Sequence, residues 1–341
     1  MALAESRSLN GRRCPRCFCG DLAPSTTDAS LDASSRADAC PQCGLSFFWR
    51  GGLLDVLGPT ERETQAAEVE SFYTKSPFPG YAPGDDGPAI LDRCRRNPFT
   101  ESLHRALPPD ARVLDIGTGT AQIPAYLALA GPRRNVFGLD GCRMSLTHAE
   151  EFRARAGIQN LQLVRSDIFD LPIEPESFQF VLSRGVVHHT PDPDLAIANV
   201  AKCVAPGGTL VLGFYETMGR AFHSFRRQLS RPRGKPYRFL DPVLRRGDLD
   251  EEKKRIWIDD QYFHPLEHIL PLPRVNRVLE GLGFRVIRTV PPAAPTSTLF
   301  DPSAMPGSLG IFNRRLGWMI SGCNNPDAGL VCVVARRQER S

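Results

Sequence analysis

Four cysteines near the start of the chain have the spacing of a metal site. They are Cys14 and Cys17 in one C-P-x-C pair, and Cys40 and Cys43 in another. Two such pairs can bring four thiolates together around a tetrahedral Zn²⁺. Gly44 fits the tight turn in which a bound sulfur accepts backbone N–H bonds. Cys19 is also available, but it does not belong to a C-P-x-C pair. The sequence therefore predicts a structural zinc site, with a leader of free cysteines as the alternative.

A second stretch, VLDIGTGTA at residues 113–121, has the pattern of a nucleotide-binding turn. An apolar strand runs into Gly117 and Gly119, where the missing β-carbon lets the backbone turn tightly and approach a ligand closely. A pyrophosphate site would have a third glycine where Ala121 stands. The carboxylate of Asp115 would also repel phosphate. It suits a ligand that carries an ammonium or sulfonium group.

The elements that must position these residues alternate along the chain. Apolar, β-rich runs separated by helical patterns predict a doubly wound α/β fold with a seven-stranded, mostly parallel sheet. The expected strands lie at 111–117, 135–140, 161–167, 177–184, 208–215, 284–290 and 329–337. The expected helices lie at 121–130, 144–156, 195–203 and 274–281. We expect an insertion at about 216–270 and a loop between the last two strands.

The VLDIGTGTA stretch resembles the first motif of class I S-adenosylmethionine-dependent methyltransferases, in the methyltransferase type 11 or ubiquinone-biosynthesis-like group. Three later stretches fall in the family's order: Leu139-Asp140, Arg165–Ile168 and Ser183–His189. The resemblance covers residues 85–215 and implies a Rossmann-like sheet that binds S-adenosylmethionine. The alternative is a nicotinamide-dependent enzyme, which the missing G-x-G-x-x-G frame disfavours.

The resemblance also implies roles for individual residues. Asp140 would accept hydrogen bonds from the ribose hydroxyls, Asp167 would accept one from the adenine amine, and Ile168 would pack on the adenine ring. The cofactor-binding residues that it implies are Asp115, Gly117, Thr118, Gly119, Asp140, Gly141, Asp167, Ile168 and Arg184.

Candidates for the methyl acceptor's side come from two other stretches. His188 and His189 follow the fourth strand, at the edge where doubly wound sheets bind ligands, so either is a candidate general base. The alternative is that they only shape the following loop. Residues 259–268, DDQYFHPLEH, resemble a stretch found in uncharacterised members of the group. On a helix, His264 and His268 would share one face and could bind a metal ion together. For these two histidines we favour a role in the acceptor pocket or in packing over metal binding. The candidate substrate residues are Tyr73, Tyr81, Tyr262 and His264.

Charge gives only local information. The 42 Lys and Arg residues against 38 Asp and Glu residues leave a net charge of +4, which is too weak to indicate nucleic acid. Residues 220–238 hold seven Arg or Lys and no acid, so this insertion is a candidate anion-binding patch. It is poor in the aromatic residues that single-stranded RNA binding requires.

These observations predict a cytoplasmic methyltransferase that acts on a small-molecule acceptor and has no membrane span. RNA is the second candidate, because the cysteine module resembles zinc-ribbon leaders found before some methyltransferases, including bacterial rRNA guanine methyltransferases. A non-catalytic scaffold that binds S-adenosylmethionine is the third. We expect a zinc-ribbon-like module at 1–58, a helical connection that covers the active site at 59–110, and the methyltransferase domain at 111–341.

Overall fold

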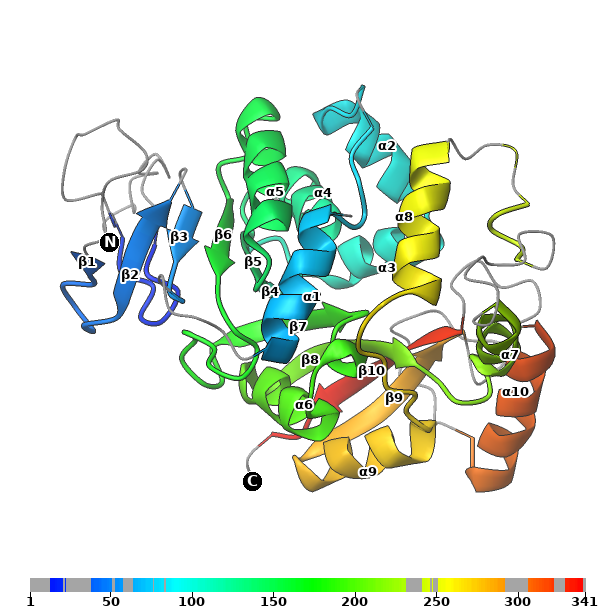
Figure 1. Cartoon of the computed structure of the whole chain (residues 1–341). Coiled ribbons are helices and arrows are strands. Elements are labelled where there is room, and N and C mark those ends of the chain that lie inside the picture. Colours follow the sequence, from blue (N-terminus) through cyan, green and yellow to red (C-terminus); the bar gives the residue numbers. More distant parts are fainter. Residues whose placement is uncertain are drawn as a thin grey trace.

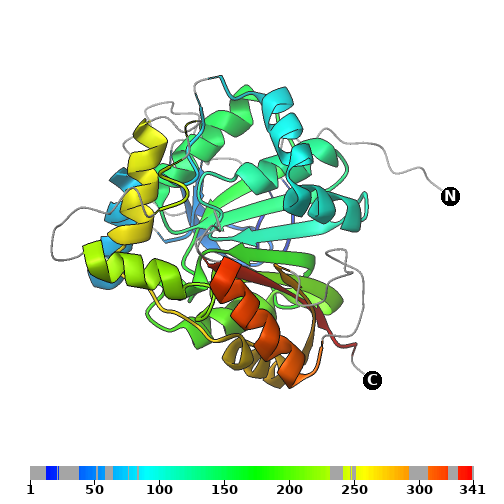
Figure 2. The same ribbon diagram turned by 90° about the vertical axis from the view of Figure 1, so that its right-hand side faces the viewer.

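A twisted β-sheet runs through the protein and carries helices on both faces (Figures 1 and 2). The structure is a computed structural model. It describes residues 13–20, 22, 38–50, 53–57, 64–75, 77–82, 84–230, 241–245, 247, 251–291, 306–321 and 329–339. Part of the basic stretch at 220–238 and the boundary expected near residue 58 fall outside these residues.

Seven strands have the expected doubly wound arrangement, in the order β6-β5-β4-β7-β8-β10-β9. Neighbouring strands from β4 to β8 pair in parallel, and β10 pairs antiparallel with both β8 and β9. The strands are β4 Arg112–Ile116, β5 Asn135–Asp140, β6 Leu161–Arg165, β7 Phe178–Arg184, β8 Val204–Tyr215, β9 Phe284–Val290 and β10 Leu330–Arg337.

The fold class is confirmed, but in the part of the chain that the structure describes the sheet has ten strands instead of the expected seven. Three short N-terminal strands extend it beyond β6: β1 Asp38–Ala39, β2 Ser46–Arg50 and β3 Leu53–Asp55. β3 pairs in parallel with β6, opposite Val164 and Arg165. A three-residue strand has too little periodicity to be recognised, and its pairing partner lies far away in the sequence. The cysteine module is therefore joined to the main sheet.

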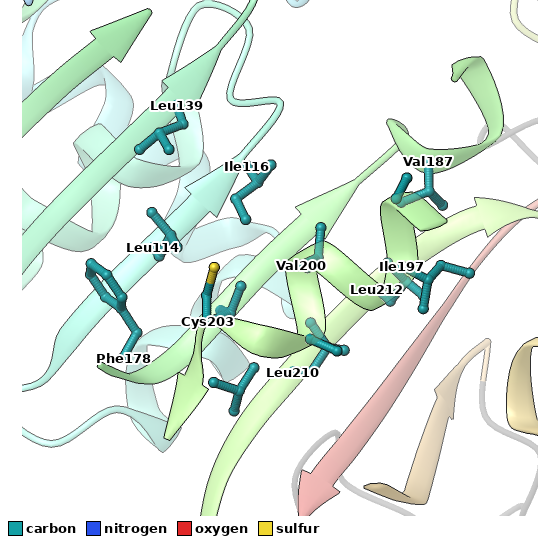
Figure 3. Packing of buried hydrophobic residues seen from close by; sticks show 14 of the residues in the cluster. Leu114, Ile116, Leu139, Phe178, Val187, Ile197, Val200, Cys203, Leu210 and Leu212 are labelled. Atoms are coloured by element: carbon teal, nitrogen blue, oxygen red, sulfur yellow. The ribbon is translucent and has the colours of Figure 1, made fainter. Parts of the chain in front are cut away.

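Side chains that alternate along the strands divide the core into two layers. Leu114, Leu139 and Leu212 point to the face covered by α6 and α9 (Figure 3). Their neighbours Val113 and Val211 point to the opposite face, which α2 to α5 cover. This period of two is expected for strands buried on both faces.

The helices agree with most of the sequence-based expectations. They are α1 Thr64–Lys75, α2 Gly87–Arg96, α3 Pro98–Ala106, α4 Gln122–Ala130, α5 Arg143–Arg155, α6 Pro193–Lys202, α7 Ala221–Ser230, α8 Glu251–Tyr262, α9 Leu272–Gly281 and α10 Ser308–Ser321, with a 3₁₀ turn at Val187–His189. Side chains of Asp86, Asn97 and Asp192 cap α2, α3 and α6. The expectation of a loop between β9 and β10 was incomplete, because α10 lies there. The sequence did not predict this helix, since it contains Gly310 and Gly317 and glycine disfavours helix. None of the described helices combines the length and apolar composition needed to cross a membrane.

Candidate functional site

A cavity of about 790 Å³ lies at the carboxyl ends of the parallel strands. This volume falls within the range of small-molecule sites, and the position is the one where doubly wound sheets bind ligands. The residues that line it are Leu57, Val69, Glu70, Tyr73, Phe78, Ile116, Gly117, Gly119, Leu139, Asp140, Gly141, Cys142, Ser145, Ser166, Asp167, Ile168, Phe169, Asp170, Leu171, Arg184, Gly185, Val186, His189, Thr190, Pro191, Tyr215, Trp257, Asp260, Gln261, Leu266 and Leu330.

The turn between β4 and α4 needs its two glycines. Gly117 and Gly119 have φ angles of 74° and 54°, in the left-handed region that favours glycine. A β-carbon on Gly117 would lie 2.1 Å from a methyl group of Val186. The backbone of Phe78 leaves no room for a β-carbon on Gly119 either. Both glycines line the cavity, so the turn brings backbone to its wall.

Asp115 and Thr118 lie behind this turn and do not line the cavity. The Thr118 hydroxyl donates a hydrogen bond of 2.8 Å to the buried Asp115 carboxylate. Burial raises the pKa of Asp115 to about 7, against the effect of the threonine hydrogen bond. In this structure the pair stabilises the turn.

Asp140, at the end of β5, connects the turn to the next strand. Its carboxylate accepts hydrogen bonds from the backbone N–H groups of Gly119 (2.8 Å) and Cys142 (2.7 Å). Asp140 and Gly141 both line the cavity. A carboxylate has about four lone-pair sites, so Asp140 keeps acceptor capacity for a ligand.

The ends of the next two strands supply the rest of the predicted cofactor group. Asp167 accepts a hydrogen bond from the backbone N–H of Phe169 (2.9 Å), and it lines the cavity with Ile168. Arg184, at the end of β7, also lines the cavity, and its guanidinium lies 5.4 Å from the centre of the Phe99 ring. Four strand ends therefore converge on one cavity.

The segment 77–82 covers the glycine turn. The Thr120 hydroxyl donates to the carbonyl of Pro79, and the Gln122 amide donates to that of Gly80 (3.0 Å). Tyr81 does not line the cavity. Its hydroxyl donates to the carbonyl of Thr120, and its ring stacks on Phe152 with 4.3 Å between centroids. Tyr81 thus fastens the segment to the domain.

A polar wall comes from α8, within the stretch 259–268 that the sequence singled out, although Asp260 and Gln261 were not among the candidate site residues. Asp260 and Gln261 are buried and line the cavity, as do Tyr73 and Tyr215. The Tyr73 hydroxyl donates to Asp260 (3.3 Å), and the Gln261 amide donates to Asp260 (2.6 Å) and to the Tyr215 hydroxyl (2.7 Å). Burial raises the pKa of Asp260 to about 6, although the hydrogen bond from Gln261 lowers it.

The histidines pack against this wall. His189 lines the cavity, and its Nδ1 lies 2.7 Å from the carbonyl of Leu266, so Nδ1 carries the proton and donates it. Burial lowers the pKa of His189 to about 3. His264 stacks on the His189 ring with 3.7 Å between centroids and lies outside the cavity lining. His188 is fully buried, does not line the cavity, and has its pKa lowered by burial. All three rings are neutral near pH 7.

The remaining residues of the 259–268 stretch hold the wall in place. Tyr262 points away from the cavity and donates a 2.7 Å hydrogen bond to Asp241. The fully buried Arg220 donates to the side chains of Gln261 (2.6 Å) and Glu267 (2.7 Å). The signal available in the sequence was the clustering of polar residues in DDQYFHPLEH. It could not tell which of them face the cavity.

The four predicted metal ligands come together at the N-terminus. The sulfur atoms of Cys14, Cys17, Cys40 and Cys43 all lie within 4.8 Å of one another. Two pairs, Cys14 with Cys43 and Cys17 with Cys40, are 3.6 Å apart. A Zn²⁺ tetrahedron with bonds of about 2.3 Å separates its sulfurs by roughly 3.8 Å, so the cluster fits this ion.

Two equivalent backbone turns hold these cysteines. The N–H of Cys14 donates to the carbonyl of Cys19, and that of Cys40 donates to Leu45. In each turn the fifth residue, Phe18 or Gly44, has a positive φ, of 58° and 71°. Cys19 therefore occupies the position of Leu45, after the turn, although its sulfur lies 3.3 Å from that of Cys40.

Comparison with known proteins gives the same picture. Residues 114–212 match the family described as "Methyltransferase domain". From Methylococcus capsulatus, malonyl-[acyl-carrier protein] O-methyltransferase is 30% identical over 42% of this chain and 50% of its own length. The tRNA U34 carboxymethyltransferase of the same organism is 32% identical over 35% of this chain and 37% of its own length. The chain thus matches half or less of these relatives.

A solved structure gives the fold at lower identity. PKMT2 from Rickettsia typhi, in complex with AdoHcy, superposes with a TM-score of 0.53 at 15% identity, over 77% of this chain and 55% of that one. The family match lies on the strands whose ends form the cavity. Residues 114–212 therefore match a methyltransferase-domain family, and the sheet around them has the fold of a known methyltransferase structure.

Proposed function

We propose that the protein transfers the methyl group of S-adenosylmethionine to a small-molecule acceptor. One observation carries the proposal: a single cavity is lined both by the strand-end residues of the methyltransferase motifs and by a separate polar wall from α1, β8 and α8. Two such groups of residues are what a cofactor and an acceptor require.

The strand-end residues fit the cofactor. Gly117 and Gly119 bring backbone to the wall of the cavity, while Asp140 and Asp167 offer carboxylate oxygens to hydroxyl and amine donors. Ile168 adds an apolar surface for a flat ring. When bound, S-adenosylmethionine supplies an electrophilic methyl group on its sulfonium. The chain's own task is to hold the acceptor in line with that group, because positioning supplies much of the catalysis of such a displacement.

Asp260 is the residue best suited to take a proton from the acceptor. A general base works best when its pKa lies near the working pH. Burial brings the pKa of Asp260 to about 6, whereas it lowers that of His189 to about 3. His188 does not reach the cavity. We therefore assign proton acceptance to Asp260. We assign orientation of the acceptor to Tyr73, whose hydroxyl donates a hydrogen bond to Asp260.

The charge of the cavity favours a small, non-phosphorylated acceptor over RNA. Among the described residues that line it, Arg184 is the single Lys or Arg, and five are Asp or Glu. An acidic wall repels a phosphate backbone. The two Methylococcus relatives are named for a malonyl-[acyl-carrier protein] and for a tRNA, so acceptors of more than one class occur among similar proteins.

Zinc completes the proposal. The spacing of the four sulfurs and the two equivalent turns support a structural Zn²⁺ held by Cys14, Cys17, Cys40 and Cys43. Four protein ligands leave no open position, which is typical of structural zinc.

The test is transfer of labelled methyl from S-adenosylmethionine into fractionated lysate of the organism that makes the protein. We expect label in a low-molecular-weight fraction, and at limiting cofactor much less label with Asp140→Ala. Label that ribonuclease releases would establish RNA as the acceptor. Tight cofactor binding without label in any fraction would favour the non-catalytic scaffold.

A further inference from the structure

Arg220 is fully buried in the turn between β8 and α7, behind the polar wall of the cavity. Its guanidinium donates a 2.6 Å hydrogen bond to the side-chain oxygen of Gln261 and a 2.7 Å bond to the carboxylate of Glu267. The guanidinium carbon lies 3.5 Å from the centre of the Tyr215 ring. Gln261 and Tyr215 line the cavity, whereas Arg220 does not. A buried ion pair is weak evidence for stability, so we ask what these contacts do for the wall.

Arg220 determines which way round the Gln261 amide lies. A guanidinium has five N–H donors and no acceptor, so only the oxygen of the amide can face it. The amide nitrogen then points the other way, where it donates to Asp260 (2.6 Å) and to the Tyr215 hydroxyl (2.7 Å). An amide turned by half a rotation would set its NH₂ group against the guanidinium and its oxygen against the Asp260 carboxylate. Both of those contacts are repulsive.

The orientation of Gln261 decides what the wall offers to a ligand. One oxygen of Asp260 accepts the hydrogen bond from Gln261, and the other accepts that from the Tyr73 hydroxyl (3.3 Å). Hydrogen bonds to a carboxylate favour its ionised form. Tyr215 takes the Gln261 bond on its oxygen, so its own proton can be donated to a group in the cavity. The wall therefore presents a carboxylate and an O–H donor side by side.

The charges around Asp260 act in the same direction as this orientation. The charged and titratable groups that face it come from α1, β8, the turn before α7 and the segment after α8, and they are Tyr73, Tyr215, Arg220 and Glu267. Burial raises the pKa of Asp260 to about 6, while the Gln261 hydrogen bond and the positive charge of Arg220 lower it. Arg220 thus acts on Asp260 twice, directly through its charge and indirectly through Gln261.

The turn that carries Arg220 is itself fixed by hydrogen bonds. The Arg220 N–H donates to the carbonyl of Glu216, directly after β8 (2.7 Å). The buried Glu216 carboxylate accepts from the N–H groups of Met218 (2.8 Å) and Gly219 (3.1 Å). The guanidinium therefore approaches Gln261 from a defined point of the backbone.

We propose that Arg220 is the positioning residue of the acceptor wall: it fixes the Gln261 amide, and through that amide the hydrogen bonds of Asp260 and Tyr215. Arg220 acts through Gln261 and does not line the cavity. Its importance for catalysis rests on the proposed function, in which Asp260 takes a proton from the acceptor.

Titration of the Asp260 carboxyl in the full-length protein tests the proposal without cofactor, acceptor or turnover. NMR of protein labelled with ¹³C at the aspartate carboxyls follows the ionisation, and Asp260→Asn identifies the signal by its loss. Gln261→Glu keeps a partner for Arg220 but replaces the donor to Asp260 by an acceptor. The pKa of Asp260 should therefore rise by about 1 to 2 pH units. Arg220→Met should raise it too, and Arg220→Lys, which keeps the charge and a donor, should raise it less.

Arg227→Met is the matched control. Arg227 also pairs with Glu267 (3.0 Å), but its other hydrogen bond goes to the carbonyl of His264 (3.1 Å) and not to Gln261. This variant should lower the melting temperature and leave the pKa of Asp260 nearly unchanged. The control thus separates loss of a buried ion pair from loss of the Gln261 orientation.

The proposal is overturned if Asp260 titrates at the same pH in the wild type, Gln261→Glu and Arg220→Met, or if Arg227→Met shifts the pKa as much as Arg220→Met. Should Arg220→Met fail to fold, Gln261→Glu and Arg220→Lys carry the test. A pKa that moves as expected, with equal transfer of labelled methyl by Asp260→Asn and the wild type, would support the positioning role of Arg220. The same result would overturn the role of Asp260 as base, so the two failures are distinguishable.

Discussion

Asp140 carries the clearest prediction at the scale of single residues. If it accepts hydrogen bonds from the ribose, Asp140→Ala should weaken binding of S-adenosylmethionine and S-adenosylhomocysteine by about 1.5–3 kcal/mol, roughly ten- to hundredfold in Kd. Asp167→Ala should have a smaller effect, since water can replace it at the edge of the adenine. Calorimetry on both variants measures these changes.

Asp140 also holds the backbone of Gly119 and Cys142, so a second variant is needed. Asp140→Asn keeps an acceptor oxygen for the turn but removes the charge, and its affinity should lie between those of the wild type and Asp140→Ala. Unchanged binding of both ligands to a folded Asp140→Ala protein would show that the nucleotide lies elsewhere.

The raised pKa of Asp260 predicts how the rate of the reaction depends on pH. Its folded-state pKa of about 6 means that the carboxylate accepts a proton above this pH and is itself protonated below it. The kcat should therefore fall as pH decreases through about 6, by about tenfold per unit. Asp260→Asn should lower kcat roughly a hundredfold or more and abolish this dependence. A wild-type kcat that stays constant across that pH range would contradict the role of base.

The stability of the same variant provides the control. Because the pKa of Asp260 is raised on folding, ionising it opposes folding above pH 6, and this cost disappears as pH falls and the carboxyl is protonated. Asp260→Asn should thus unfold at the same or a higher temperature than the wild type at about pH 8. Circular dichroism melting curves decide whether a lost kcat reflects chemistry or loss of the fold.

Residues at strand ends were predictable from the sequence, whereas the acceptor wall was predictable only in part: Tyr73 and the stretch 259–268 were expected there, but not Asp260 itself. Asp140 and Asp167 follow apolar runs directly, and parallel strands bring such ends together whatever the rest of the chain does. Asp260 reaches the cavity through the packing of α8 from an insertion, and nothing local fixes that approach. Tyr81 and Tyr262 show the converse: they lie outside the cavity lining, and their hydroxyls donate to the backbone of Thr120 and to the side chain of Asp241.

At the scale of elements, the two cysteine turns predict which thiols bind metal. Cys40→Ser should lower zinc content from about one ion per chain and reduce the melting temperature. Cys19→Ser should keep both, because Cys19 occupies the position that Leu45 has in the other turn. Metal analysis after purification measures the content. Zinc lost equally from the two variants would mean that Cys19 is a ligand.

The elements of the sheet could be predicted for a physical reason that also explains the failures. β4 to β8 are buried on both faces, so they appear as continuous apolar runs. β3 has three residues and is ordered through its pairing with β6, a contact made far along the chain. Helix α10 has apolar residues on both faces, Leu309 and Ile320 on the exposed one and Trp318 on the buried one, which weakens the amphipathic pattern by which a surface helix is recognised.

At the scale of the whole molecule, Arg165 connects the cysteine module to the cavity. It donates to Asp55 on β3 (3.1 Å), to Glu70 on α1 (2.9 Å) and to the carbonyl of Gly141 (3.1 Å). Glu70 and Gly141 line the cavity. One guanidinium thus links three elements that surround the cofactor side of the site.

Arg165→Met should therefore weaken both cofactor binding and the fold. Removing one partner of a buried ion pair costs up to about 3–5 kcal/mol, and the almost fully buried Asp55 would keep only the more distant Arg50, at 3.6 Å. The matched control is Arg274→Met, since Arg274 pairs with Asp194 at the surface (2.9 Å) and exposed pairs contribute about 0–1 kcal/mol. Cofactor affinity and melting temperature should change in the first variant only. If both variants bound the cofactor with the same affinity, the cysteine module would have no effect on the cofactor site through Arg165.

The pairing of β3 with β6 also bears on how the chain matures as it is synthesised. Cys14 and Cys43 are 29 positions apart, whereas Asp55 and Arg165 are 110 apart. A ribosome releases all four cysteines long before it has made the strand on which the module docks. Short loops close at a lower entropic cost than long ones, so the cysteine turns can form first. The growing domain would then meet a preformed edge, β3, as a template for β6.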